Sequence, residues 1–335
     1  MIPLSILDLA PIAEGSTASD SFRNARELAQ HGERLGFQRY WLAEHHGMPG
    51  IASAATAVVM AYVAAGTSTI RIGAGGIMLP NHAPLVIAEQ FGTLEALYPG
   101  RIDLGLGRAP GSDQTTARAL RRTLETDSDA FPQDVLELQD YMSDTPRQRV
   151  LAVPGKGAKV PLWILGSSTF GAQLAAHMGL PFAFASHFAP QMMMQAISIY
   201  RGNFQPSAQL AKPHVMLGFN VFAADTDEEA RFRATSMQQA FVNLRTGKPS
   251  RLQQPQKGYL EALGPQERAM LDSVLSCSAI GSPETVSRQL QEFITRTGAD
   301  ELMITSQIFD HAHRLRSYEI TADVHQSLKQ AEMAL

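Results

Sequence analysis

Residues 161–165, Pro-Leu-Trp-Ile-Leu, form a short apolar run that ends at Gly166, and a helix-like segment follows from Phe170 to Met178. An apolar run without polar alternation is typical of a strand buried on both faces, as in a parallel sheet. Strand and helix patterns of this kind alternate along the whole chain. We expect eight strands, which cover residues 4–9, 40–43, 70–79, 102–106, 161–165, 182–185, 215–222 and 301–305.

Eight strands that are each followed by helix predict a (β/α)8 TIM barrel, an α/β fold, rather than two domains. An open doubly wound sheet also alternates strand and helix, but it more often carries a glycine-rich fingerprint after its first strand, and this chain has none there. We therefore expect a single domain over residues 1–335. Two segments, near 109–131 and 245–280, break the pattern, and we expect them to be irregular insertions and candidate lids.

The composition is that of an ordinary globular protein, because 44% of the 335 residues are hydrophobic and 18% are charged. The formal net charge of -4 leaves no basic excess to neutralise a phosphate backbone, so we expect no nucleic acid partner. The single cysteine, Cys277, excludes an intramolecular disulfide and a Cys-rich metal site. No segment reaches the ~18 apolar residues of a membrane helix, and the first residues lack the cationic region of a signal peptide. We expect a cytoplasmic protein without membrane contact.

The second expected strand ends in Glu44-His45-His46. In a TIM barrel the chemistry lies at the carboxyl ends of the strands. Because neighbouring residues of a strand point to opposite faces, at most one of the two histidines points into the barrel mouth. His45 is suited to be a base, a proton donor or a metal ligand, and the structural alternative is a histidine held by a backbone carbonyl. The neighbouring Glu44 favours a functional role.

Two adjacent glycines, Gly75 and Gly76, lie near the end of the third expected strand. Glycine inside a strand usually marks a bulge or a close approach of the backbone to something flat or bulky. The spacing alone does not separate a packing bulge from a surface on which a flat ligand rests.

Arg108 follows the fourth expected strand, and Ser167 and Ser168 follow the fifth, directly before a helix. A guanidinium group can pair with phosphate, and the free N–H groups at a helix start bind anions. Each signal has an ordinary alternative, a salt bridge at the rim for the arginine and helix capping for the serines. Together, at neighbouring strands, they favour a phosphorylated cofactor.

Four other polar residues, His187, Asp310, His311 and His313, also follow strand ends. A His-x-His pair is a metal motif in barrel hydrolases, but there it belongs to the first strand. The first strand of this chain offers Asp8 and no histidine. We therefore expect no metal site.

The stretches Tyr40-Trp-Leu-Ala-Glu-His-His46, Gly75-Gly-Ile-Met-Leu-Pro80, Tyr98-Pro-Gly-Arg-Ile-Asp-Leu-Gly-Leu-Gly-Arg108 and Gly298-Ala-Asp-Glu-Leu-Met303 occur together. With this combination the chain resembles, over nearly its whole length, the bacterial luciferase-like flavin-dependent monooxygenase family. The resemblance implies a TIM barrel, usually in a homodimer, that uses reduced FMN and O2 to oxidise a small organic substrate. It also implies a separate NAD(P)H-dependent flavin reductase, which supplies the reduced FMN. The alanine-rich helix expected over residues 53–65 suits close helix packing, within or between subunits.

Carried over position by position, the resemblance implies that His45 is the active-site histidine beside the flavin ring, with Glu44 in support. The family has a strand bulge under this ring, often with a cis peptide bond that does not precede proline. The implied cofactor-binding residues are Gly75 and Gly76 at the bulge, and Arg108, Ser167 and Ser168 at the phosphate.

The light-emitting members carry a reactive cysteine where this chain has Gly107, so we expect neither light emission nor a long-chain aldehyde substrate. Two alternative functions stay open. One branch of the family transfers hydride with coenzyme F420 on the same barrel, and the glycine bulge does not separate the two cofactors. The other alternative is a non-catalytic flavin-binding protein, against which the pair Glu44 and His45 argues.

Overall fold

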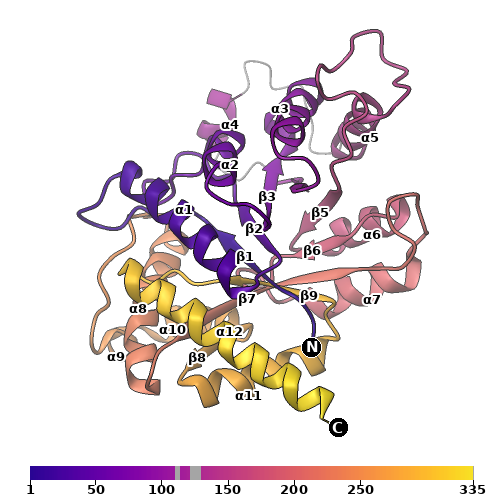
Figure 1. Ribbon diagram of the computed structural model, residues 1–335. Coiled ribbons are helices and arrows are strands. Elements are labelled where there is room, and N and C mark those ends of the chain that lie inside the picture. Colours follow the sequence, from indigo (N-terminus) through magenta and orange to yellow (C-terminus); the bar gives the residue numbers. More distant parts are fainter. Residues whose placement is uncertain (110–113, 121–129, 335) are drawn as a thin grey trace.

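The computed structural model describes residues 1–109, 114–120 and 130–334. Eight parallel strands form a closed ring with helices around it, which confirms the predicted TIM barrel (Figure 1). The barrel strands are β1 (Leu4–Asp8), β2 (Arg39–Leu42), β3 (Arg71–Met78), β4 (Ile102–Gly107), β5 (Leu162–Gly166), β6 (Phe182–Phe184), β7 (Val215–Ala223) and β9 (Glu301–Thr305). The ring closes because β6 pairs with β7, β7 with β9, and β9 with β1.

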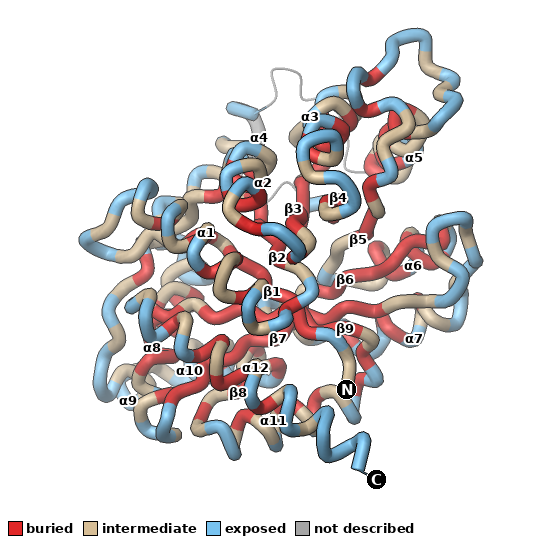
Figure 2. The backbone as a smooth tube through the Cα atoms, viewed as in Figure 1, coloured by how far each residue is buried: buried red, intermediate tan, exposed pale blue. Residues whose placement is uncertain are grey.

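The helices cover the outside of this ring, and their inner faces and the strands are buried while their outer faces are exposed (Figure 2). The helices are α1 (Ala18–Leu35), α2 (Thr56–Ala64), α3 (Pro84–Leu97), α4 (Gln114–Leu120), α5 (Phe131–Met142), α6 (Thr169–Met178), α7 (Met193–Asn203), α8 (Asp227–Arg245), α9 (Tyr259–Ala262), α10 (Pro265–Leu275), α11 (Pro283–Thr297), α12 (His311–Met333) and the short 3-10 helix η1 (Leu79–Asn81).

Capping residues that the sequence shows begin and end helices in the structure, and α11 is an example. Ser282 caps α11 by accepting the N–H of Thr285, Pro283 stands in its first turn, and Gly298 ends it in the left-handed conformation with φ 58°. The helix expected from Ser53 begins instead at Thr56, because the Ser53 hydroxyl donates to the carbonyl oxygen of Ala43 and belongs to the turn before the helix.

The segment 245–280 is irregular in its first part, residues 246–258, and forms helices and a strand after it. It contains α9 and α10 and ends in a ninth strand, β8 (Ser278–Gly281), which pairs with Asn220–Ala223 of β7 outside the ring. Leu271 and Val274 of α10 join a second apolar core with α8, and this burial orders the segment. In the segment 109–131, α4 is helical, and residues 110–113 and 121–129 lie outside the described residues.

Charged side chains fill the barrel at the amino ends of its strands. Asp103 of β4 accepts hydrogen bonds from Arg39 (2.8 Å) and Arg71 (2.6 Å), and Arg39 also donates to Glu301 of β9 (3.0 Å). Both carboxylates are fully buried, and the two guanidinium groups balance their charge. The nitrogen Nε1 of Trp41, in the apolar layer above, donates to Asp103 as well (3.1 Å). This packed floor leaves the carboxyl end of the barrel for a ligand.

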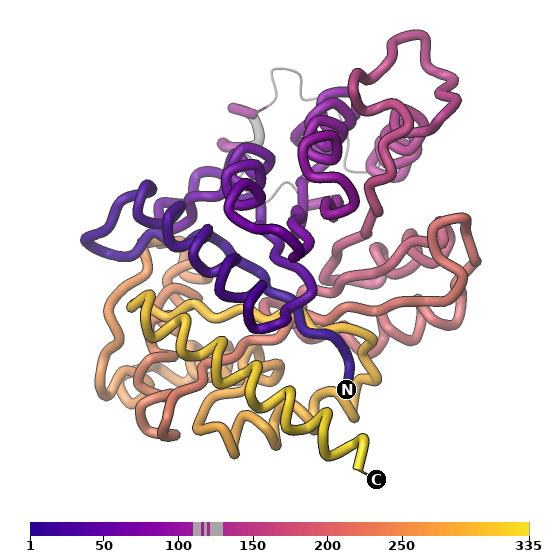
Figure 3. The backbone as a smooth tube through the Cα atoms, viewed as in Figure 1, coloured from indigo at the N-terminus to yellow at the C-terminus, as the bar shows by residue number. Residues whose placement is uncertain are grey.

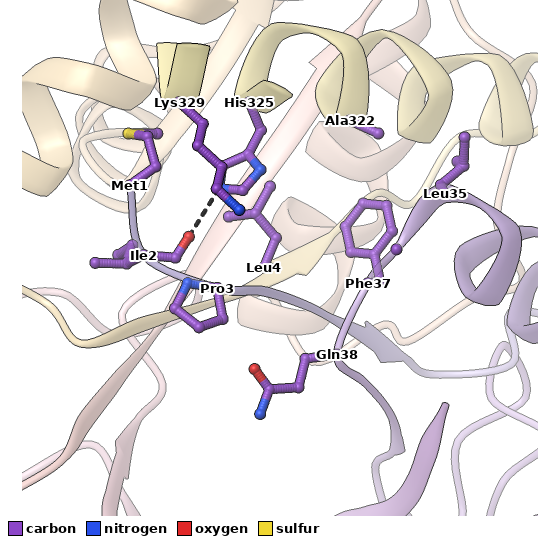
Figure 4. Close-up of a pocket in the computed structure, with 11 residues that line it drawn as sticks. Met1, Ile2, Pro3, Leu4, Leu35, Phe37, Gln38, Ala322, His325 and Lys329 are labelled. Carbon is purple, nitrogen blue, oxygen red and sulfur yellow. Dashed lines mark hydrogen bonds between the residues drawn. The ribbon is translucent and has the colours of Figure 1, made fainter. Parts of the chain in front are cut away.

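The two ends of the chain meet at the amino end of the barrel, where β1 begins beside the end of α12 (Figure 3). A cavity of about 250 Å³ lies there between the first residues and α12, and Nε2 of His325 donates to the Ile2 carbonyl oxygen at its edge (Figure 4). In barrels this end contributes stability rather than chemistry. None of the helices described here is long and apolar enough to span a membrane.

Candidate active site

The inward-facing side chains change from the middle of the barrel to its carboxyl end. In the middle, Leu7, Trp41, Trp163, Met216 and Met303 belong to one buried apolar cluster. The inward positions one step further along the strands are partly exposed; they include Leu9, His45, Gly75 and Leu165. The barrel is therefore filled up to this level and accessible above it, where barrel enzymes have their active sites.

Gly75 and Gly76 form a bulge between β3 and β4. The register shifts by one residue between Ala74 and Ile77, and the Gly75–Gly76 peptide bond is cis, so the expected bulge and cis peptide are confirmed. A Cβ on Gly76 would lie 2.7 Å from the carbonyl oxygen of Gly105 on β4. Close packing of the two main chains thus explains the glycine, and the two glycines add no side chains of their own to this edge of the mouth.

Glu44 is buried at the end of β2 and organises a network of hydrogen bonds. Its Oε1 lies 2.7 Å from Nε2 of His46 and 2.9 Å from Nε2 of His82. Its Oε2 accepts the backbone N–H of Met78 at the end of β3 (3.0 Å). The carboxylate therefore ties the end of β2 to the segment that follows the bulge.

Burial alone would raise the pKa of Glu44, but the hydrogen bond and charge of His82, with the hydrogen bonds of His46 and Met78, hold this pKa below its usual value of 4.5. Glu44 is thus ionised at neutral pH. Among the residues that the structure describes, Glu44, His46 and His82 are also the one group whose ligand-type atoms lie within 4.8 Å of one another. These atoms share the hydrogen bonds of the network described above.

His46 and His82 are neighbours of the site that the sequence patterns do not predict. Glu44 and His46 are two residues apart, so strand alternation places them on the same face and could have indicated their contact. His82 comes from the residues after η1, and no periodic pattern carries that information.

His45 follows Ala43, which belongs to the inward cluster, and is half-buried at the mouth. Its charge contributes to lowering the pKa of His187, which follows β6, so the two imidazoles share one electrostatic environment. β2 ends at Leu42, so residues 43–45 continue the chain beyond the strand, and an inward-facing His45 stays a prediction.

Arg108 and the start of α6 lie together at the mouth. The guanidinium carbon of Arg108 is 4.1 Å from the ring centroid of Phe170, in the first turn of α6. Ser168 is the N-cap residue of α6, yet its side chain makes no capping hydrogen bond. No carboxylate of the described residues forms an ion pair with Arg108. The cation, the hydroxyl of Ser168 and the first N–H groups of α6 are therefore grouped as an anion site requires.

The remaining polar residues after β9 have structural roles. Asp310 caps α12 by accepting the N–H of His313 (2.9 Å), and His311 lies 3.3 Å from Glu27 of α1. Asp8 pairs with the buried Arg314 of α12 (2.7 Å) and so attaches this helix to β1. A second cavity, of about 350 Å³, lies beside these residues and α8.

The sequence matches the model of the luciferase-like monooxygenase family over residues 2–301. It is 55% identical over 328 residues to a luciferase-like monooxygenase from Escherichia coli (strain K12), covering 98% of each chain. It is 33% identical to an N-acetyl-S-alkylcysteine monooxygenase from Bacillus subtilis (strain 168), covering 96% of this chain and 98% of the other.

Among solved structures, apo-MsnO8 is similar with a TM-score of 0.87 and 34% identity, covering 97% of this chain and 99% of that chain. Two more distant structures share the fold alone. One is the oxygenating constituent of 3,6-diketocamphane monooxygenase from Pseudomonas putida, in complex with FMN (TM-score 0.70, 17% identity, 96% of each chain). The other is an F420-dependent secondary alcohol dehydrogenase (TM-score 0.68, 13% identity, 95% of this chain and 97% of that chain). Taken with the barrel and its mouth, these likenesses show that the chain belongs to the luciferase-like monooxygenase family.

Proposed function

We propose that this protein is a flavin-dependent monooxygenase that takes reduced FMN from a separate NAD(P)H:flavin reductase and uses O2 to oxidise a small organic substrate. The observation that carries the proposal is the grouping of Arg108 with the uncapped start of α6 beside a mouth edge without side chains. A cytoplasmic location is part of the same proposal.

The residues of the mouth fit a flavin nucleotide. Its phosphate needs a cation and free N–H groups, which Arg108, Ser168 and the first turn of α6 offer, with Ser167 exposed beside them. Its flat ring needs an edge on which no side chain stands, and the bulge at Gly75 and Gly76 provides one. When bound, reduced FMN supplies the electrons that activate O2.

The protein's own residues position the bound flavin, exclude water from the site and carry a proton. The filled barrel below the mouth keeps water away from one side of the site. The imidazole of His45 holds or releases a proton at the mouth, which is the role that histidine serves best near neutral pH. Glu44 bonds His46 after β2 and the N–H of Met78 after the bulge. It therefore holds these two segments in place and does not itself touch the ligand.

The structure also supplies a reason to expect no light emission. A Cβ at Gly107 would lie 2.8 Å from the sulfur of Met78, so the thioether occupies the space that a cysteine side chain needs. The organic substrate is therefore to be sought among other small molecules. An N-acetyl-S-alkylcysteine, the compound in the name of the Bacillus subtilis relative, is the first to test.

A homodimer is part of the proposal, and α2 and α3 are its interface. Val58 and Tyr62 lie one turn apart on α2 and are 71% and 39% exposed, and Val86 and Leu97 of α3 are 43% and 60% exposed. A helix that is apolar on all sides is normally buried, so a second copy of the chain is the occupant that we propose for this surface.

The first prediction tests the activity. The protein loaded with reduced FMN is mixed with O2, and the flavin absorbance is followed; we expect reoxidation at a rate that differs from that of free reduced FMN. Since proton transfer by a positioned histidine contributes about a hundredfold or more, His45→Ala should change this rate by at least about tenfold. His177→Ala, at an exposed position of α6, is the matched control.

Reoxidation at the rate of free reduced FMN would contradict the proposed monooxygenase activity. An unchanged rate in His45→Ala, with FMN still bound, would favour the non-catalytic flavin-binding protein. Tighter binding of F420 than of FMN in a parallel titration would favour hydride transfer.

The second prediction concerns the phosphate. Arg108→Ala removes charge-assisted hydrogen bonds of about 1.5–3 kcal/mol, so the Kd for FMN should rise about 10- to 100-fold. Riboflavin has the same ring without the phosphate, and its Kd should stay nearly unchanged. Fluorescence titration measures both, with Arg147→Ala at an 87% exposed position as the control. An equal loss for both flavins would show that Arg108 does not hold the phosphate.

The third prediction concerns Glu44. Glu44→Gln removes the charge from a buried hydrogen-bonding network and replaces one of its two acceptor oxygens by an NH2 donor, so it should lower the free energy of unfolding at pH 7 by about 1–3 kcal/mol. Because the folded-state pKa of Glu44 is lowered, its contribution is complete above the unfolded value of 4.5 and is lost as the pH falls through the folded value. Urea unfolding should thus show a difference between the two proteins that shrinks below pH 4.5. Glu261→Gln, at an exposed position of α9, should change nothing at any pH.

The fourth prediction concerns the dimer. Val58→Glu places a charge in the proposed interface, so sedimentation at micromolar concentration should show dimer for the parent protein and monomer for the variant. Met333→Glu replaces an apolar residue of α12 that is 80% exposed and should leave the dimer intact. A parent protein that sediments as a monomer would remove this part of the proposal.

A further inference from the structure

Gly218 interrupts β7, a strand of buried residues, at a position that faces the barrel interior. A Cβ at Gly218 would lie 2.0 Å from Nδ1 of His187, so the imidazole of His187 occupies the place of a side chain there. His187 follows β6, which is the neighbour of β7 in the barrel. The glycine therefore makes room for this ring inside the mouth.

Side chains fix the segment that carries the ring. The amide Nδ2 of Asn220 donates to the carbonyl oxygen of His187 (2.9 Å), and the hydroxyl of Ser186 donates to the carbonyl oxygen of Gly218 (2.7 Å). The next residue, Phe188, packs edge-on against Phe241 of α8 with 5.9 Å between the ring centroids. The position of the imidazole is thus preorganised, as a ligand-contacting group requires.

The two ring nitrogens of His187 have different surroundings. Nδ1 is buried against Gly218 and has no hydrogen-bond partner among the described residues, whereas the side chain as a whole is only half-buried. Nε2 is therefore the nitrogen that a molecule in the mouth can reach. Nδ1 has no hydrogen bond within the described part of the protein, so no such bond to Nδ1 fixes the ring, and Nε2 is the nitrogen left to bond a ligand.

The ring of His187 is uncharged under physiological conditions. Burial, and then the nearby charge of His45, lowers the pKa of His187 to about 4. An uncharged imidazole suits a neutral polar group, in contrast to the cation of Arg108, which suits phosphate. The two ends of the mouth thus differ in the chemistry they accept.

We propose that His187 is a second ligand-facing histidine of this site, with its Nε2 placed to hydrogen-bond an uncharged polar group, such as an amide or a hydroxyl, of the organic substrate. The inference rests on the proposed function and adds a substrate class to it. The charge-bearing part of the cofactor binds at Arg108, and the substrate binds on the wall formed by β6 and β7.

Modification by diethyl pyrocarbonate, which attacks accessible uncharged imidazoles, tests this assignment in the intact protein. We expect modification of His187 in the FMN-loaded protein and, with an N-acetyl-S-alkylcysteine added at ten times its Kd, protection of about tenfold, because the amide of this compound then occupies Nε2. Peptide mass spectrometry reads the rate at each histidine, and His177 on α6 should keep its rate. In Gly218→Ala the new methyl displaces the ring, so the rate at His187 without FMN should change.

Flavin fluorescence in the same samples reports whether FMN is bound. If FMN is bound and His187 reacts as fast with the added N-acetyl-S-alkylcysteine as without it, the assignment of His187 is overturned while the proposed function stands. A His187 that resists modification without FMN, or an unchanged rate in Gly218→Ala, overturns it as well. If FMN does not bind at all, the proposed function fails and this inference fails with it.

Discussion

The main chains of β3 and β4 touch at Gly76 and Gly105, and this contact determines what the barrel mouth can hold. A Cβ on Gly105 would lie 2.4 Å from the carbonyl oxygen of Ala74, so both strands need glycine at the contact. The glycines of this edge bear no side chains of their own, and β4 continues from it to Arg108 beside the start of α6. Along this side of the mouth, the glycines offer main chain to the flat ring of a ligand, and Arg108 offers a positive charge to its phosphate.

The arginines at the amino end of the barrel form ion pairs with buried carboxylates, whereas the arginine at the carboxyl end is placed to bind a ligand. At the floor, Arg39 and Arg71 are neutralised by buried Asp103 and Glu301, and this network closes the amino end. At the mouth, Arg108 has an aromatic ring rather than a carboxylate as its described contact. A guanidinium group that no carboxylate of residues 1–109, 114–120 and 130–334 neutralises can pair with an anionic ligand.

The periodic parts of the fold could be predicted from the sequence, because strands such as Leu162–Gly166, buried over its first three residues, are continuously apolar. The segment 245–280 could not, since its helices are ordered by a second core with α8 rather than by a regular repeat. In the site, alternation predicts that His45 faces inward, whereas the contact of Glu44 with His82 depends on how η1 packs. The place of His187 depends on the absence of a side chain at Gly218, which spacing does not reveal.

The most direct test of the account is a crystal structure of the protein with bound FMN. The account predicts that the ring lies against the Gly75–Gly76 peptide and that the phosphate lies between Arg108 and the first turn of α6. FMN bound elsewhere on the protein, or with its phosphate away from Arg108, would contradict it.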